Sequence, residues 1–357
     1  EVGLRIESDR MENATMDEEG LKNEMEVIKQ EKLMRVGNSP WGRFWFFFGE
    51  KFFESSHCKH PIIGYDKDLD EMNIENVRNF YNTYYKPNNA TLVLAGDITK
   101  EKAEKMARDC FGKIKPSHIE NRPKLETPPL GRGYNEYTFK DPMMTMYFLI
   151  LTVPVPGYGT ADLEGMELIA EHLSGGNSSW LNENLVETGI ALNSWASARA
   201  GRIGKYFMIG AGFKSPGERD KGKKIIMEKL QELKKKKIKR KEYKKIINLI
   251  ESSEMFELES LKGIASLLSV LETHYNAEYL NEHIDNLKEI SRKDMREYAR
   301  KYFNKENYSV FMIDPGKKNV NLEEFRPEKP YNYKKEEVPI ISISPEKLKE
   351  SFSYLKK

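Results

Sequence analysis

The feature that most constrains the fold of this chain is an internal repeat. Residues 77–93 align without a gap with residues 295–311. The matched pairs include Tyr84 with Tyr302 and Asn89 with Asn307. In each copy an amphipathic helix ends at an aromatic pair, a polar turn follows, and an apolar strand comes next. Two copies of one helix–turn–strand unit predict two domains of the same α+β fold.

A segment rich in proline and glycine, residues 116–133, separates the two copies. It is poor in apolar residues and is typical of an exposed linker. We therefore expect a first domain over residues 1–115, a second over residues 134–318, and a charged tail over residues 319–357. Each domain is expected to be a mainly antiparallel sheet packed with helices. Alternating or continuous apolar runs predict the strands at 91–95, 135–139, 145–153, 191–198, 205–213 and 309–313, with a strand at 338–343 and a helix at 345–355 in the tail.

Composition narrows the classes of function. With 58 Lys and Arg against 56 Asp and Glu, the net charge is only +2, so no overall field favours nucleic acid as a partner. No apolar run is long enough to span a membrane. The two cysteines, Cys58 and Cys110, favour free thiols, although one disulfide is possible. The compartment is left open, with periplasm and cytoplasm both compatible.

The most informative local segment is residues 21–40, which predicts one helix of about four turns. Asp17 can cap its start, and Gly37, Asn38 and Pro40 end it. Its expected apolar side consists of Val27, Ile28, Leu33, Met34 and Val36. Glu24 and Glu31 are seven residues apart, so both carboxylates lie on nearly the same face. Such a pair suits a metal cation or a proton-transfer role, but helical glutamates are more often simply solvated.

The order of residues around this pair resembles a known family. Glu24, Glu26-Val27-Ile28, Glu31 and Asn38-Ser39-Pro40 are similar to the E-x-E-V-V-x-x-E…(D/N)-S-P segment of the M16 metallopeptidases, the inverzincins. The stretch YYKPNNATLVLAGD between two helices is similar to another segment of that family. The resemblance implies a half-shell of two tandem domains. It also implies a zinc metalloendopeptidase that cleaves peptides or unfolded proteins inside a closed chamber, with a metal-activated water.

Carried onto this chain, the resemblance implies that Glu31 is the third protein ligand of Zn²⁺ and that Glu24 supports the catalytic site. The other two ligands and the general base of the family lie on an H-x-x-E-H helix. This sequence contains no such motif, and only 30 residues precede Glu31. We therefore expect the chain to begin after the catalytic helix and to be inactive and metal-poor alone.

The family also has an Arg and a Tyr that bind substrate, and Val186 and Leu192 occupy the corresponding places. The resemblance therefore implies a homodimer or heterodimer in which another M16 subunit supplies this pair. An alternative is a non-catalytic M16-like subunit, structural or peptide-guiding, although the retained Glu24 and Glu31 argue against it. A third interpretation leaves Glu31 as a surface residue of an unrelated α+β protein.

Four further segments have alternative interpretations. His57, Cys58 and His60 could form a second metal site, but they lack a fourth ligand at suitable spacing. The aromatic helix at 41–53 favours core packing over a ligand-binding box. The Gly-rich turn at 175–179 favours packing over phosphate binding because the known phosphate motifs are absent. The basic run at 234–245 could bind acidic partners, but the flanking Glu232 and Glu242 favour a solvated helix junction.

Overall fold

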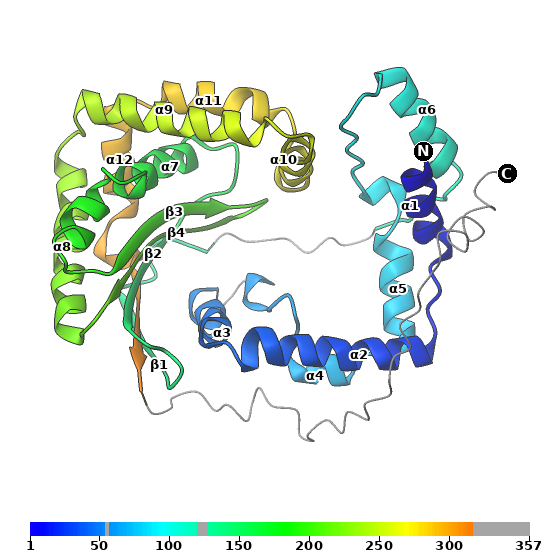
Figure 1. Ribbon diagram of the computed structural model, residues 1–357, viewed down its shortest axis with the longest axis horizontal. Helices are drawn as coiled ribbons and strands as arrows, with labels where there is room; N and C mark the ends of the chain where they lie inside the picture. Colours follow the sequence, from blue (N-terminus) through cyan, green and yellow to red (C-terminus); the bar gives the residue numbers. More distant parts are fainter. Residues whose placement is uncertain (54–56, 120–127, 317–357) are drawn as a thin grey trace, which may run out of the picture.

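The α+β class is confirmed. The structure is a computed structural model that describes residues 1–53, 57–119 and 128–316. The tail expected at 319–357, with its strand and helix, lies outside the described residues, as does part of the expected linker. Within the described part, a five-stranded sheet is packed on both faces by helices (Figure 1). No helix within it is long and apolar enough to cross a membrane.

The sheet is built entirely from residues 135–315. These lie in the part of the chain after the expected linker, its second half. Its strands run in the order β1-β5-β2-β4-β3. Their bounds are β1 Asn135–Asp141, β2 Tyr147–Pro154, β3 Asn193–Ala200, β4 Gly204–Phe213 and β5 Ser309–Pro315. Only β1 and β5 pair in parallel, and the other three pairings are antiparallel. The five strands predicted for this half, and their mainly antiparallel arrangement, are confirmed.

Both faces of the sheet are buried, which explains the continuous apolar run in β2. Because side chains alternate along a strand, Phe148 and Ile150 enter one hydrophobic cluster. Leu149, Leu151 and Val153 enter the other. A strand covered on both sides shows no polar alternation.

One face is covered by a layer of helices that follow β2 in the chain (Figure 1). The layer contains α7 Ala161–Ser174, the short η4 Asn182–Val186, α8 Pro216–Lys235, α9 Arg240–Glu257, α10 Leu261–His274, α11 Tyr279–Glu289 and α12 Arg292–Tyr302. The cluster beneath it is the larger of the two cores and includes Leu163, Leu230 and Phe303, each fully buried. The expected helix junction is confirmed, since α8 ends at Lys235 and α9 begins at Arg240.

The opposite face is covered by α3 Pro40–Phe52, which belongs to the first half of the chain. Ser39 caps this helix by accepting a hydrogen bond from the Gly42 amide at 3.1 Å. Phe44, Phe48 and Phe52 recur every four residues and are 2% exposed or less. The expected core role of this aromatic segment is confirmed.

The rest of the first half is helical within its described residues. It comprises α1 Val2–Asn13, α2 Glu18–Lys32, η1 Leu33–Gly37, η2 His57–Lys59, α4 Asp66–Asp70, α5 Ile74–Tyr84, η3 Pro87–Asn89 and α6 Lys100–Phe111. In Figure 1, α1, α5 and α6 form a group apart from the sheet, and α2 runs from α3 toward this group.

The internal repeat has a structural counterpart. Asn89 Nδ2 donates to the Tyr84 carbonyl at 2.9 Å, and Asn307 Nδ2 donates to the Tyr302 carbonyl at 3.0 Å. Each asparagine thus satisfies a carbonyl at the end of its helix, which explains why the two turns share one sequence.

The strand predicted at 91–95 is not formed. The matching β5 lies between β1 and β2, whereas the described residues of the first half contain no strand with which 91–95 could pair. An apolar run gains a strand's hydrogen bonds only where a neighbour offers them. The domain boundaries at 115 and 134 stay a prediction.

Candidate functional site

The two glutamates singled out by sequence lie on α2, and the packing of this helix determines which way they point. Asp17 accepts a hydrogen bond from the Gly20 amide at 2.6 Å and so caps the helix, as predicted. Met25 and Lys32 of α2, with Val36 of the η1 turn that continues it, form the buried face. Lys32 is only 4% exposed, and its ammonium contacts Asp66 at 2.8 Å.

The expected apolar side of this helix is therefore partly wrong. Val36 is buried as expected, but Val27 is 57% exposed and Met34 is 64% exposed. Lys32 takes an interior position because its stem is apolar while its ammonium is satisfied by Asp66 and lies 5.8 Å from the Phe46 ring. Hydrophobic periodicity counts a lysine as polar and so places the buried face too far round the helix.

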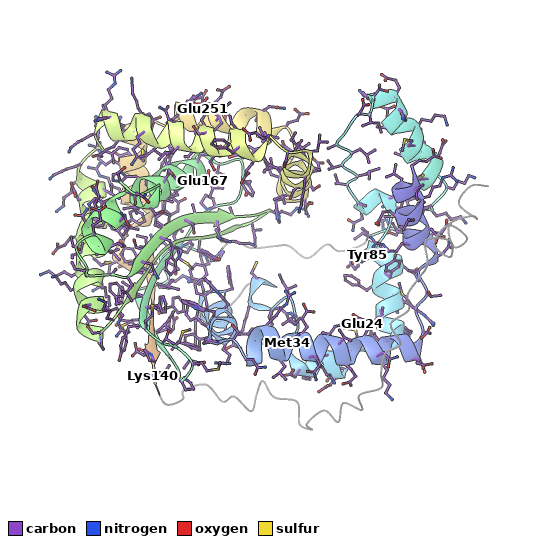
Figure 2. The ribbon with its side chains drawn as sticks, in the orientation of Figure 1. Glu24, Met34, Tyr85, Lys140, Glu167 and Glu251 are labelled. Atoms are coloured by element: carbon purple, nitrogen blue, oxygen red, sulfur yellow. The ribbon has the colours of Figure 1, made fainter. Side chains whose placement is uncertain are left out.

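Glu24 and Glu31 both lie away from the buried face. Glu24 is exposed and makes no hydrogen bond or ion pair within the described part of the chain (Figure 2). The Glu31 side chain is 37% exposed, and its Oε1 lies 2.7 Å from Arg35 Nη2. Seven residues of helix separate the two Cα atoms by roughly 10 Å along the axis. At that spacing one carboxylate can bind a metal ion directly while the other acts beside it.

The residues of this chain do not fit a zinc ion by themselves. A catalytic zinc takes three protein ligands, and Glu31 offers one carboxylate. Within residues 1–53, 57–119 and 128–316, no three His, Cys, Asp or Glu side chains are grouped so as to hold a metal ion. This also leaves the alternative of a second metal site around His60 without support, since His60 Nε2 contacts Asp68 Oδ2 at 2.7 Å.

The places expected for a substrate-binding Arg and Tyr carry apolar side chains. Val186 ends the short η4, and Leu192 precedes β3 with its side chain 42% exposed. The Leu192 amide donates to the Gly212 carbonyl at 2.8 Å. Neither side chain can donate a hydrogen bond to a substrate.

A cluster that sequence reasoning missed lies in the helical layer. His283 of α11 stands between Glu254 of α9, at 2.8 Å, and Glu167 of α7, at 3.2 Å. Nearby, the Tyr279 hydroxyl donates to Glu164 Oε1 at 3.0 Å. Of these groups, Glu167, Glu254, Tyr279 and His283 border a cavity of about 220 Å³. Figure 2 places Glu167 in the helical layer, remote from Glu24 on α2.

Burial and charge oppose one another at His283. Burial of the ring favours the neutral form, but hydrogen bonds and charges from Glu167 and Glu254 outweigh it and raise the pKa of His283 to about 9. The imidazolium therefore bridges two carboxylates at neutral pH and ties three helices together. More than a hundred residues separate Glu167 from His283 in the sequence, so no local pattern could have indicated the contact.

Comparison with known proteins agrees with the fold. The sequence profile of the Peptidase M16 inactive domain matches residues 71–250. The chain is 22% identical over 321 residues to the zinc protease PqqE of Helicobacter pylori, covering 87% of this chain and 71% of that protein.

Two solved structures show the same fold. A protease from Helicobacter pylori superposes with a TM-score of 0.79 at 22% identity, over 88% of this chain and 76% of that one. A peptidase M16 inactive domain from Pseudomonas fluorescens superposes with a TM-score of 0.75 at 16% identity, over 88% and 74%. Since this profile spans half of the sequence, the chain belongs to the M16 peptidase family.

Proposed function

We propose that this chain forms part of an M16 zinc metalloendopeptidase, with Glu31 as one zinc ligand and Glu24 as the carboxylate that supports it. The observation that carries the proposal is the shared face of these two residues. Both lie away from the buried face of α2, and neither is needed to hold the helix in place, because Met25, Lys32 and Val36 do that. Two carboxylates with no role in packing are available for a site.

Zinc, when bound, would polarise the scissile carbonyl and lower the pKa of a water molecule. Within the described residues no histidines stand beside Glu31 to hold the metal, so the proposal takes two histidine ligands and a general base from outside them. Glu31 would contribute an anionic oxygen, which zinc accepts beside imidazoles. Glu24 lies two helical turns before Glu31. It would orient the site rather than bind the metal itself. The proposed substrates are peptides or unfolded proteins.

The proposal includes pairing with a second M16 subunit. Val186 and Leu192 leave the sites of the substrate-binding Arg and Tyr without donors, so another subunit, identical or not, would supply them. An active enzyme that is monomeric under assay conditions would exclude this part of the proposal.

A second candidate is a non-catalytic, peptide-guiding or structural subunit. It is favoured by the match to an inactive M16 domain and by the Arg35 guanidinium, which already occupies one oxygen of Glu31. In that case Glu31 would contribute only a surface ion pair.

The two candidate functions differ in whether the zinc content of the protein depends on Glu31. The intact gene product, purified from its source and checked by mass, would be assayed for bound zinc and for hydrolysis of an unfolded protein such as casein. We expect about one zinc per active site and a loss of both zinc and hydrolysis in Glu31→Gln. Glu24→Gln should lower zinc affinity roughly 10-fold or more, as loss of a supporting carboxylate does.

The matched control is Glu19→Gln, an exposed glutamate of the same helix on a different face. It should leave zinc and hydrolysis unchanged. Zinc-free native protein, or Glu31→Gln protein with full zinc, would refute the peptidase assignment and support the non-catalytic subunit.

A further inference from the structure

A dense group of positive charges covers the junction of α8, α9 and α12. Seven of the eight residues from 234 to 241 are lysine or arginine, and only Ile238 interrupts them. Ile238 is buried and anchors the junction, while Lys235, Lys237 and Lys241 are exposed. The anchor fixes the backbone of this short connection and leaves its cations pointing into solvent.

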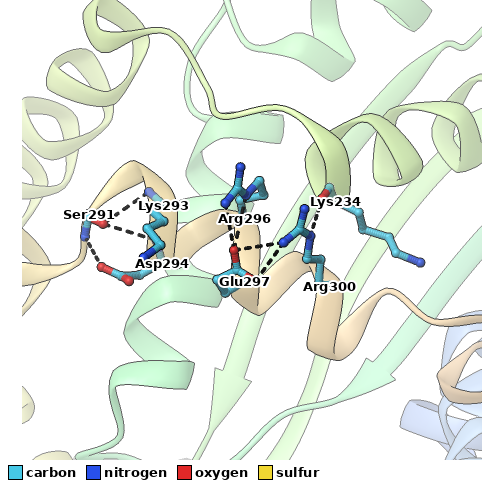
Figure 3. Close-up of polar contacts among 7 residues, drawn as sticks. All are labelled: Lys234, Ser291, Lys293, Asp294, Arg296, Glu297 and Arg300. Atoms are coloured by element: carbon cyan, nitrogen blue, oxygen red, sulfur yellow. Dashed lines mark hydrogen bonds and ion pairs between the residues drawn. The ribbon is translucent and has the colours of Figure 1, made fainter.

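Helix α12 adds cations to the same place from a distant part of the sequence. Arg300 Nε donates to the Lys234 carbonyl at 2.8 Å, and Arg292 Nη1 donates to the Ile238 carbonyl at 3.1 Å. These bonds hold α12 against the junction, as Figure 3 shows for Arg300 and Lys234. We call residues 234–241, together with Lys293, Arg296 and Arg300, the basic corner.

The carboxylates at the basic corner do not neutralise it. Glu297 is held by Arg296 at 2.9 Å and by Arg300 at 3.1 Å, and Asp294 accepts from the Ser291 amide as part of a helix cap (Figure 3). The other two carboxylates, Glu232 and Glu242, contact lysines only at 3.5 Å or more. Within the described part of the chain, no ion pair is made by Lys235, Lys237, Arg240 or Lys241.

Stabilisation of a helix end does not account for so many cations. The C-terminus of α8 favours positive charge, but the effect fades within the last turn and needs one or two lysines. The whole chain has a net charge of only +2, so the excess is local rather than a general property. Unpaired cations this close together repel one another, and a negatively charged surface relieves that repulsion.

The chemistry of the basic corner favours a lipid surface over nucleic acid. Six of its seven cations between 234 and 241 are lysines, which act as mobile point charges rather than as the rigid fork that reads bases. The nearby Tyr243 cannot serve as a stacking platform, because it is half-buried and its hydroxyl donates to the Ile290 carbonyl at 2.7 Å. In Figure 1 the junction lies at an outer corner of the helical layer, where a flat surface can reach it.

We propose that the basic corner is a docking surface for anionic phospholipid headgroups, through which the protein binds a membrane peripherally. The binding is electrostatic, since the exposed side chains of residues 234–241 are cations and the one apolar side chain among them is buried. Lysines near an anionic bilayer each contribute independently and are screened by salt. This inference does not depend on the peptidase assignment.

The test is co-sedimentation of the full chain with vesicles. One set of vesicles contains phosphatidylcholine alone, and a second also contains phosphatidylglycerol. We expect binding only to the second set, released by added salt. The triple variant Lys235→Gln, Lys237→Gln, Lys241→Gln should bind about 100-fold more weakly, at roughly fivefold per lysine. Its circular dichroism should be unchanged because these side chains are exposed and unpaired.

The matched control neutralises Lys100, Lys102 and Lys113, three exposed lysines on or just after α6 that make no ion pair within the described residues. It should bind like the native chain. Equal binding of the two triple variants would overturn the proposal. So would binding of native protein to duplex DNA or poly-glutamate without binding to phosphatidylglycerol vesicles, which would assign the basic corner to a polyanionic macromolecule instead.

Discussion

Arg43 and Asp141 form a buried ion pair that joins the first half of the chain to the sheet. Arg43 Nε lies 2.6 Å from Asp141 Oδ2, and Arg43 Nη2 lies 2.8 Å from Asp141 Oδ1, with both side chains 0% exposed. The two parallel contacts match the fork of a guanidinium to a carboxylate. Arg43 comes from the aromatic helix α3 and Asp141 from the end of β1, so the pair fixes how α3 lies on the sheet.

Asp141→Asn should be strongly destabilising. It removes the countercharge and leaves a buried guanidinium, which costs about 3–5 kcal/mol of unfolding free energy. Urea unfolding monitored by circular dichroism would measure this. The control is Asp109→Asn on α6, which breaks an exposed pair with Lys105 and should cost less than about 1 kcal/mol. Equal losses in the two variants would show that the buried pair does not hold the halves together.

Much of the fold could be predicted from the sequence because each element carries a local signal. The apolar run of β2 and the four-residue recurrence of Phe44, Phe48 and Phe52 indicated elements that the structure contains. The contacts between elements that are distant in the sequence had no local signal. Nothing near Arg43 indicates a partner 98 residues away at Asp141, and the run at 91–95 resembles β5 but has no neighbour to pair with.

At the candidate site, too, the local geometry could be predicted from the sequence and the effect of a distant contact could not. The seven-residue spacing correctly placed Glu24 and Glu31 on a common side of α2, because helical geometry alone determines it. The exposure of Val27 and Met34 could not be predicted, since it depends on Lys32 finding Asp66 on another helix. The contact between Glu31 and Arg35 joins residues four apart on one helix, so it could have been predicted from the sequence.

The protonated His283 predicts a stability that declines in alkali. Its pKa is about 9 in the folded chain against an ordinary value of 6.5, so its contribution is full below pH 6.5 and is lost as the pH rises through 9. The loss is on the order of 3 kcal/mol. Unfolding free energies at pH 6 and at about pH 10 would measure it.

His283→Gln should remove most of that pH dependence while lowering stability at neutral pH. The control is His274→Gln, because burial and the charges of Lys205 and Arg202 lower the pKa of His274, opposite to the shift at His283. The bridge between Glu167 and Glu254 would be excluded as the cause if His283→Gln and native protein lost equal stability between the two pH values.

A glycine on β4 leaves room for the indole of a tryptophan on β3. Trp195 and Gly210 are cross-strand partners, and a Cβ at position 210 would lie 2.0 Å from Trp195 Cζ2. Gly210→Ala must therefore push the indole off the sheet, at a cost of about 1–3 kcal/mol. Gly217→Ala in the first turn of α8 meets nothing within 4 Å and should be neutral or stabilising. Thermal unfolding would compare them, and equal melting temperatures would contradict the packing argument.

The Arg35–Glu31 pair gives a test of metal binding that is independent of activity. The Arg35 side chain is 74% exposed, so Arg35→Gln should change the unfolding free energy by less than about 1 kcal/mol. If Glu31 binds zinc, the guanidinium competes with the metal for one carboxylate. Removing it should then tighten zinc binding about twofold, the worth of one exposed helical pair. Competition with a chelator would measure the affinity in the intact protein. Weaker zinc binding in Arg35→Gln would instead mean that Arg35 orients Glu31 toward the metal, and unchanged zinc binding would separate Glu31 from the metal altogether.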